Sequence, residues 1–266
     1  MRRSGKMRED QANGRRGMEM EVKKLLQAAR QQTTGLKRKK VWLFGALAAI
    51  VRITAAGMAQ AEIRDSYVDV QVGDIIEFGS YEQDNDSSNG SEPIKWRVLE
   101  VSDGSALVVS EYALDVKVYN EAYESVTWET CKLRAWLNEE FYDTAFGMEE
   151  KALIAMTKVG NEDHPMYGTN GGKDTEDWVF LLSIGEAERY FEDDEDRRTF
   201  PTEYAIARDA YVYSDLGTVW WWLRSPGYHG RSAAEVSSFG ALIYNGASVY
   251  NYKDGVRPAL RIEIVP

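Results

Sequence analysis

Hydrophobic and polar residues alternate along 94–101 of the chain, and the flanking segments 74–81 and 106–109 are also rich in apolar residues. Successive side chains of a strand face opposite sides of a sheet, so this pattern predicts three strands. The pair Asp103 and Gly104 separates the second strand from the third and favours the positive φ angles of a tight turn. We therefore expect a β-hairpin at this point.

A helical period replaces the alternation further along the chain. Leu133, Trp136 and Leu137 stand at positions i, i+3 and i+4, and Phe141 follows one turn later. This spacing places all four side chains on one face of a helix. Thr127 precedes them and is a residue type that favours the N-cap of a helix.

The second half of the chain contains further short elements. A continuous apolar run predicts a buried strand over 178–182, and Ser183 is expected to cap a helix over 185–191. A second helix is expected over 201–207, which has a proline and a glutamate near its start. The glycine-rich segment 160–176 is predicted to be a long loop.

The order of these elements predicts the domain organisation. Strands come first, then helices, then short elements and a final set of strands, which is typical of a single α+β domain over residues 66–266. Residues 1–40 are predicted to be a basic, polar extension. Residues 41–61 combine a short apolar core with an Ala-x-Ala site, which favours a secretory signal. An uncleaved N-terminal anchor and a buried core helix are the alternatives. A secretory signal or an anchor would place the protein outside the cell or on its surface.

The charge of the chain limits its partners. The net charge is −11, but residues 1–61 hold 14 basic and 4 acidic residues, and residues 62–266 hold 18 basic and 39 acidic residues. Such an acidic domain repels nucleic acids and anionic membranes. We expect a partner that is neutral or cationic, or one that binds through a local patch. We expect no binding to nucleic acid, and contact with a membrane only through the N-terminal segment.

Residues suited to catalysis or metal binding are few. His164 and His229 are the only histidines, which excludes a three-histidine metal site, and His164 is predicted to be a solvated loop residue. Cys131, the single cysteine, is expected to be a small buried side chain. The acidic run 192–196 lacks the spacing of an EF-hand and is predicted to be a solvated turn. We therefore predict no catalytic residue, no metal and no cofactor, although the many carboxylates leave an acid pair open.

The segment 220–260 has tryptophans, arginines and prolines at its two ends and a different composition between them. An arginine among tryptophans stacks on rings and donates hydrogen bonds to backbone carbonyl groups. We predict a structural role for these residues and for one tryptophan of the helix: Trp136, Trp221, Trp222, Arg224, Gly255, Arg257 and Pro258.

The middle of this segment has the composition of a binding surface. Tyrosine offers a large amphipathic contact area, and serine and asparagine offer adaptable hydrogen bonds. The alternative is that these residues simply suit exposed strands and turns. The predicted ligand-binding residues are Tyr228, His229, Arg231, Ser237, Phe239, Tyr244, Asn245, Ser248, Tyr250, Asn251 and Tyr252.

These residue types are also those that adenine-directed mutagenesis of asparagine-type codons produces, a process that does not yield lysine, glutamate or glutamine. Between Tyr228 and Tyr252 the one exception is Glu235, which we assign to the scaffold.

Several motifs resemble a family. Trp128 with LRAWLN at 133–138 and Phe141 resembles a helix of the form W…LRxWLN…F. The remaining motifs are FGSY at 78–81, IKWRVLE at 94–100, WWLRSPG at 221–227 and GVRPAL at 255–260. In this order they resemble a bacterial family of unknown function, whose members are frequently secreted or surface proteins. The layout is also similar to the formylglycine-generating-enzyme group of C-type-lectin-like folds.

The resemblance implies a C-type-lectin-like fold with short strands, two or more helices and long loops. The oxidases of that group need paired cysteines or three histidines, and its calcium-dependent lectins need motifs that this chain lacks. What remains is a secreted or surface-anchored, non-enzymatic module that binds a protein or a glycan, in the manner of retroelement-diversified variable proteins. The alternatives are a fold-related oxidase, a carboxylate-based hydrolase with a cleft of perturbed carboxylates, and a structural domain of a surface assembly.

Overall fold

A four-stranded antiparallel sheet holds both the first and the last strand of the domain, in the order β1-β2-β3-β13. The structure is a computed structural model that describes residue 24 and residues 69–264. The strands of this sheet are β1 (Ile75–Tyr81), β2 (Glu92–Ser102), β3 (Ser105–Ser110) and β13 (Ala259–Glu263). Asp103 and Gly104 join β2 to β3 with φ angles of 48° and 76°. The three early strands and the hairpin are thus confirmed.

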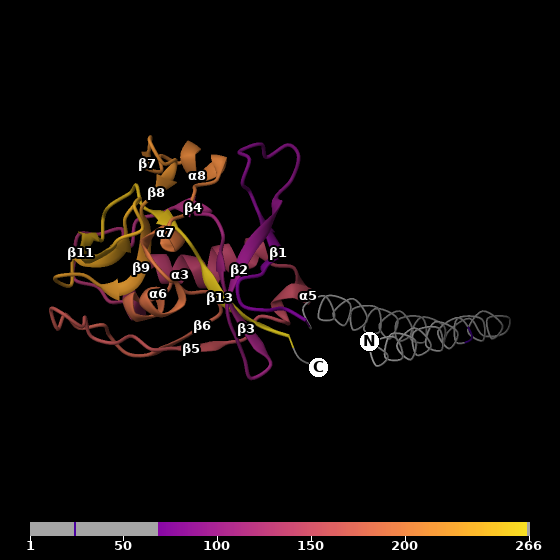
Figure 1. Cartoon of the computed structure of the whole chain (residues 1–266), viewed down its shortest axis with the longest axis horizontal. Coiled ribbons are helices and arrows are strands. Elements are labelled where there is room, and N and C mark those ends of the chain that lie inside the picture. Colours follow the sequence, from indigo (N-terminus) through magenta and orange to yellow (C-terminus); the bar gives the residue numbers. More distant parts are fainter. Residues whose placement is uncertain (1–23, 25–68, 265–266) are drawn as a thin grey trace, which may run out of the picture. The chain divides into compact units, whose positions relative to one another are not determined.

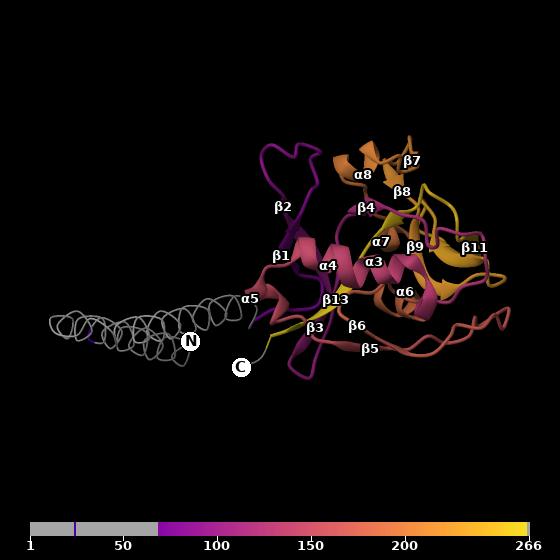
Figure 2. The same cartoon turned by 180° about the vertical axis from the view of Figure 1, so that it is seen from behind.

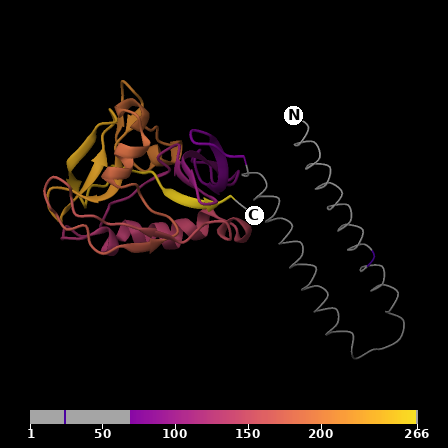
Figure 3. The ribbon, with the colours of Figure 1, turned by 60° about the horizontal axis from the view of Figure 1, so that its bottom comes forward.

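A five-stranded sheet in the order β11-β10-β9-β12-β4 contains both strands of residues 228–252, which we call the tyrosine-rich segment. Its pairs are antiparallel except β12 with β9, which run parallel. Figure 3 shows the two sheets at opposite ends of the domain. The strands are β4 (Asp115–Val116), β9 (Trp221–Pro226), β10 (Ser232–Val236), β11 (Leu242–Ser248) and β12 (Gly255–Val256).

A helical segment connects the two sheets (Figure 2). Its first turn contacts β9 and its last turn contacts β1. Leu133, Leu137 and Phe141 are buried, as the period predicts, while Trp136 is half-buried. Thr127 precedes a 3₁₀ turn, and the α-helix proper begins after Cys131, whose sulfur accepts a hydrogen bond from the Arg134 N–H. The segment consists of η1 (Trp128–Thr130), α3 (Lys132–Trp136), the π-helical η2 (Leu137–Phe141) and α4 (Tyr142–Ala145).

Shorter elements complete the domain (Figure 1). The helices expected near 185–191 and 201–207 are confirmed, and the hydroxyl groups of Ser183 and Thr202 cap them. The acidic run forms a short helix and not only a turn, because the Asp193 carboxylate caps it. These elements are α5 (Met148–Lys151), β5 (Thr157–Val159), β6 (Thr175–Asp177), α6 (Ile184–Tyr190), α7 (Asp194–Arg197), α8 (Glu203–Ala207), β7 (Val212–Tyr213) and β8 (Thr218–Val219).

The strand predicted over 178–182 is wrong, although residues 179–182 are buried. The Asn138 side chain accepts hydrogen bonds from the N–H groups of Trp178 and Val179. Phe180 makes a single bridge to Ala259. Side chains and isolated bridges therefore satisfy the buried backbone groups that a neighbouring strand would otherwise pair. The preceding loop is shorter than expected, since β6 pairs with β5.

The described domain is mixed α+β, with more strands than helices, and one continuous hydrophobic core joins both sheets and the helices. Residues 69–264 belong to one compact unit. The predicted extension over 1–40 (apart from residue 24), the predicted signal or anchor over 41–61, and residues 66–68 lie outside the described residues. Within the described part of the chain, no helix is long and apolar enough to cross a membrane.

Candidate ligand-binding site

The predicted ligand-binding residues lie on β11 and on the segments that connect β9, β10, β11 and β12. Two of them, Tyr244 and Asn251, are partly buried, and Ser237 is fully buried. The others are exposed: Tyr228, His229, Arg231, Phe239, Asn245, Ser248, Tyr250 and Tyr252.

Aromatic rings from distant parts of the chain gather around Tyr228, whose side chain is 62% exposed. Its ring centroid lies 5.0 Å from that of Tyr167 and 5.8 Å from that of His229. The Tyr228 N–H donates to the backbone oxygen of Asn245 on β11, at 3.0 Å. We call Tyr167, Tyr228, His229 and Tyr244 the aromatic surface.

His164 holds the loop 160–174 against this surface. Its ring lies 4.7 Å from the Tyr167 ring and 6.1 Å from the Tyr244 ring. The prediction that His164 is solvated is wrong, since only 1% of it is exposed. Both ring nitrogens find partners inside the protein, which compensates for the loss of water. Nε2 lies 2.9 Å from the backbone oxygen of Tyr244, and Nδ1 faces the N–H groups of Met166 and Tyr167.

Arg231 extends the aromatic surface toward the segment before the helices. Its guanidinium lies 5.3 Å from the centroid of the exposed Tyr123 ring, a cation–π contact. The neighbouring Gly230 accepts a backbone hydrogen bond from the Val126 N–H, at 2.8 Å. Sequence reasoning did not identify Tyr123 or Tyr167 as surface partners, because both lie outside the C-terminal segment.

The structure does not bring all the predicted ligand-binding residues together. The Phe239 ring packs against the ring of Tyr213, at 4.7 Å, beyond the end of β10 that lies away from Tyr228. Ser237 faces inward and accepts a hydrogen bond from the Ala241 N–H, at 3.2 Å. Ser237 is therefore part of a turn and is not available to a ligand.

A second feature is a depression of about 310 Å³ beside the five-stranded sheet. Sequence reasoning missed it, and the only signal was Glu235, the glutamate within a segment otherwise free of lysine, glutamate and glutamine. We call this feature the carboxyl depression. It is lined by Tyr211, Trp220, Glu235, Asn251, Lys253 and Asp254.

Two carboxyl groups in the depression are buried against each other. Glu235 is 5% exposed and Asp254 is 3% exposed, and the two groups are hydrogen-bonded to one another. Burial, and then the charge of Asp254, raise the pKa of Glu235 far above its ordinary range. Burial also raises the pKa of Asp254, but hydrogen bonds from Glu235 and Asn251 oppose the increase. Glu235 therefore holds the shared proton and Asp254 carries the charge.

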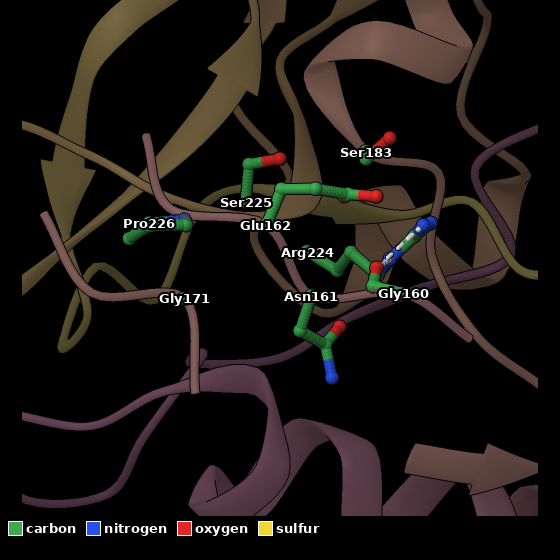
Figure 4. Close-up of a pocket in the computed structure, with 8 residues that line it drawn as sticks. All are labelled: Gly160, Asn161, Glu162, Gly171, Ser183, Arg224, Ser225 and Pro226. Atoms are coloured by element: carbon green, nitrogen blue, oxygen red, sulfur yellow. Dashed lines mark hydrogen bonds between the residues drawn. The ribbon is translucent and has the colours of Figure 1, made fainter. Parts of the chain in front are cut away.

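A smaller crevice surrounds Arg224 (Figure 4). The guanidinium donates to the backbone oxygens of Gly160 and Leu181, at 3.0 Å and 2.8 Å, and forms an ion pair with Glu186. The crevice has no room for a water molecule. The contacts of Arg224 are thus all within the protein.

The other residues to which we assign a structural role lie in or beside the core. Arg257 is fully buried, donates to the backbone oxygen of Ser110 at 2.8 Å, and lies 5.0 Å from the Trp221 ring centroid. Trp222 donates from its indole nitrogen to the Lys117 oxygen, at 2.9 Å. Pro258 and Gly255 are buried, and a Cβ at Gly255 would approach Ala113 to 2.8 Å. Trp136 packs on Phe141, with 5.5 Å between the ring centroids.

Cys131 is buried, as predicted, and burial raises the pKa of its thiol to about 12. A thiol in this state is a poor nucleophile.

Comparison with known proteins identifies a family but no activity. A family model described as a domain of unknown function, DUF6273, matches residues 103–264. Neither the comparison with curated proteins nor the comparison with solved structures gives a match.

Proposed function

Because the chain belongs to the DUF6273 family of domains of unknown function, its own residues must indicate its role, and we propose that it is a ligand-binding module. The module is secreted or surface-anchored and non-enzymatic, and its ligand is a protein or a glycan. The observation that carries this proposal is the aromatic surface, where exposed rings from the loop 160–174 and the β9–β10 turn meet over the edge strand β11.

The physical properties of this surface suit binding. Tyrosine rings bury a large area with little loss of side-chain entropy. The backbone beneath them is fixed, because Tyr228 is hydrogen-bonded to β11 and the Thr169 hydroxyl donates to the Tyr228 oxygen at 2.9 Å. A rigid support reduces the entropic cost of association.

We propose that the fold is of the C-type-lectin-like kind. The segments that carry the resemblance form the interior of the domain: WWLRSPG makes up β9 and the residue that follows it, and GVRPAL spans β12 and the start of β13. The segment between them carries the exposed residues, which is the layout that the resemblance implies. An experimental structure with a different connection of the strands would overturn this assignment.

The binding proposal is tested by comparing variants on protein and glycan arrays. Serine at Tyr167, Tyr228 and Tyr244 together removes the three tyrosine rings of the aromatic surface, and binding of any ligand found with the full chain should fall at least tenfold. Met148→Ser and Ile206→Ser are the matched controls, since they remove exposed apolar side chains from α5 and α8. Equal binding by the triple variant, with an intact fold by circular dichroism, would overturn the proposal.

Diversification of this surface by a retroelement is a further part of the proposal. It is supported by the composition between Tyr228 and Tyr252 and by the exposure of most of the predicted residues. Sequencing the corresponding gene segment across many cells should show variation at adenine-containing codons there, with 221–227 and 255–260 constant. A uniform sequence would indicate a fixed ligand.

The carboxyl depression meets the expectation of the hydrolase alternative, which requires a cleft with perturbed carboxyl groups. Glycoside hydrolysis needs carboxyl groups separated by roughly 5–9.5 Å, so that a sugar or a water molecule fits between them. Glu235 and Asp254 are instead hydrogen-bonded to each other. We therefore consider the depression as a binding site.

A further inference from the structure

Few donors of the protein reach the two carboxyl groups of the carboxyl depression. Asn251 donates from its side-chain nitrogen to Asp254, at 2.8 Å. Among the described residues, no other group donates to Asp254, and Glu235 has only the second carboxyl group as its hydrogen-bonding neighbour. Each carboxyl oxygen can accept more than one hydrogen bond. Both groups line a depression of about 310 Å³, so a ligand in the depression can donate further hydrogen bonds to them.

The walls of the depression specify the chemistry of that ligand. Two aromatic side chains, Tyr211 and Trp220, line it together with the two acids. Aromatic rings and carboxylates both attract a cation with N–H donors. We propose that the carboxyl depression binds a small organic cation, a primary ammonium or guanidinium group, which takes the place of the proton shared by Glu235 and Asp254.

The chain's own cation does not fill this position. The ammonium of Lys253 lies 3.6 Å from the Asp209 carboxylate and 5.6 Å from the Tyr252 ring centroid. It lines the depression but is paired with Asp209 and not with the acid pair. The charged and titratable groups that face the pair are therefore Lys253, whose ammonium is ion-paired with Asp209, and the Tyr211 hydroxyl.

A divalent metal ion fits the depression less well. Calcium takes six to eight oxygen ligands, and the lining offers two carboxyl groups and one amide oxygen in addition to a lysine. Among the described residues, the one group of three acids with metal-ligand spacing is Glu82 and Asp84, on the loop between β1 and β2, with Glu92, the first residue of β2. That group is unrelated to the depression.

This inference is independent of the proposed function, since the depression and the aromatic surface share no residue. An ammonium can come from a free amine or from a lysine side chain of a peptide. The probes are therefore butylammonium and methylguanidinium for the free cation, and N-acetyl-lysine methylamide for the side chain.

The test is calorimetric titration of the full chain with these probes, between pH 6 and pH 8, in two buffers of different ionisation enthalpy. Binding should release up to one proton, because the cation replaces the shared one, and affinity should rise with pH by up to tenfold per unit. Glu235→Gln retains the shape of the protonated acid and should bind at least tenfold more weakly without proton release. Lys253→Met should bind severalfold more tightly, because a like charge is removed.

Several outcomes would overturn the inference. These are no binding at 10 millimolar probe, equal binding by Glu235→Gln, binding without release of a proton, or a preference for Ca²⁺ over all three probes. Asp254→Asn serves as the second variant should Glu235→Gln fail to fold. Tyr228→Ser should leave the binding of these cations unchanged, whatever its effect on protein or glycan ligands.

Discussion

The Nε2 atom of His164 lies 2.9 Å from the backbone oxygen of Tyr244, and this contact joins the loop 160–174 to the edge strand β11. The N–H groups of Met166 and Tyr167 face Nδ1 at 3.0 Å and 3.1 Å, so Nδ1 is the acceptor and Nε2 carries the hydrogen. One buried imidazole thus fixes both the turn that presents Tyr167 and its distance from Tyr228.

Replacement of His164 by alanine should release this loop. Three backbone groups lose their partner, which should lower the free energy of unfolding by about 2 kcal/mol. Hydrogen exchange of residues 160–174 should become faster, and denaturation in urea measures the loss of stability. His229→Ala is the matched control, because this second histidine is exposed and its removal should cost no more than about 0.5 kcal/mol. Equal effects of the two substitutions would contradict the role of His164.

Local patterns predicted the early strands and the main helix, because alternation and the i, i+3, i+4 spacing depend only on neighbouring residues. The failures involve partners far along the chain. The run 178–182 has the composition of a strand, but Asn138 binds its backbone. Nothing near His164 indicates that Tyr244 lies against it, 80 residues later.

The same distinction applies to the candidate site. The composition of the tyrosine-rich segment could predict that many of its side chains are exposed. It could not predict which residues from other segments lie against them. Tyr228 meets Tyr167 only because the loop 160–174 runs beside the five-stranded sheet. The carboxyl depression could not be found from sequence, because Glu235 and Asp254 are adjacent only once β10 and the β11–β12 connection are in place.

Arg224 offers a test of the structural role that we assign to it. Methionine at this position removes the guanidinium from the Glu186 carboxylate, which then keeps, among the described residues, only the Ser183 N–H, and from two backbone oxygens. Loss of one member of a buried ion pair costs roughly 3–5 kcal/mol. We expect about 3 kcal/mol, since the Glu186 side chain is 28% exposed and water can reach it. The measurement is urea denaturation, with the exposed Arg231→Met as control. A loss no greater than that of the control would show that Arg224 is dispensable to the fold.

Gly240 is expected to be essential to the turn between β10 and β11. Its φ angle is 87°, and a Cβ there would lie 1.5 Å from the backbone oxygen of Asp194. Alanine must therefore displace either this turn or α7. Gly90→Ala separates the strain of a positive φ angle from the clash with Asp194, because Gly90 has a similar φ of 96° with no atom within 4 Å. Both variants carry the strain of positive φ, about 1–2 kcal/mol. Gly240→Ala should lose at least 2 kcal/mol more in chemical denaturation, and equal losses would mean that the close approach to Asp194 is not maintained.

Glu235 should make the domain less stable as the pH rises. Burial and the charge of Asp254 raise its pKa in the folded state, so above its ordinary value of 4.5 the folded protein keeps a proton that the unfolded chain releases. Its contribution to stability is therefore complete below pH 4.5 and is lost as the pH increases, by at most about 1.4 kcal/mol per unit. Glu235→Gln cannot ionise and still offers an N–H to Asp254. The Tm of this variant relative to the original chain should thus increase between pH 5 and pH 8, while the exposed Asp215→Asn should show no such trend. Parallel Tm profiles for Glu235→Gln and the original chain would mean that Glu235 does not hold a proton in the folded protein.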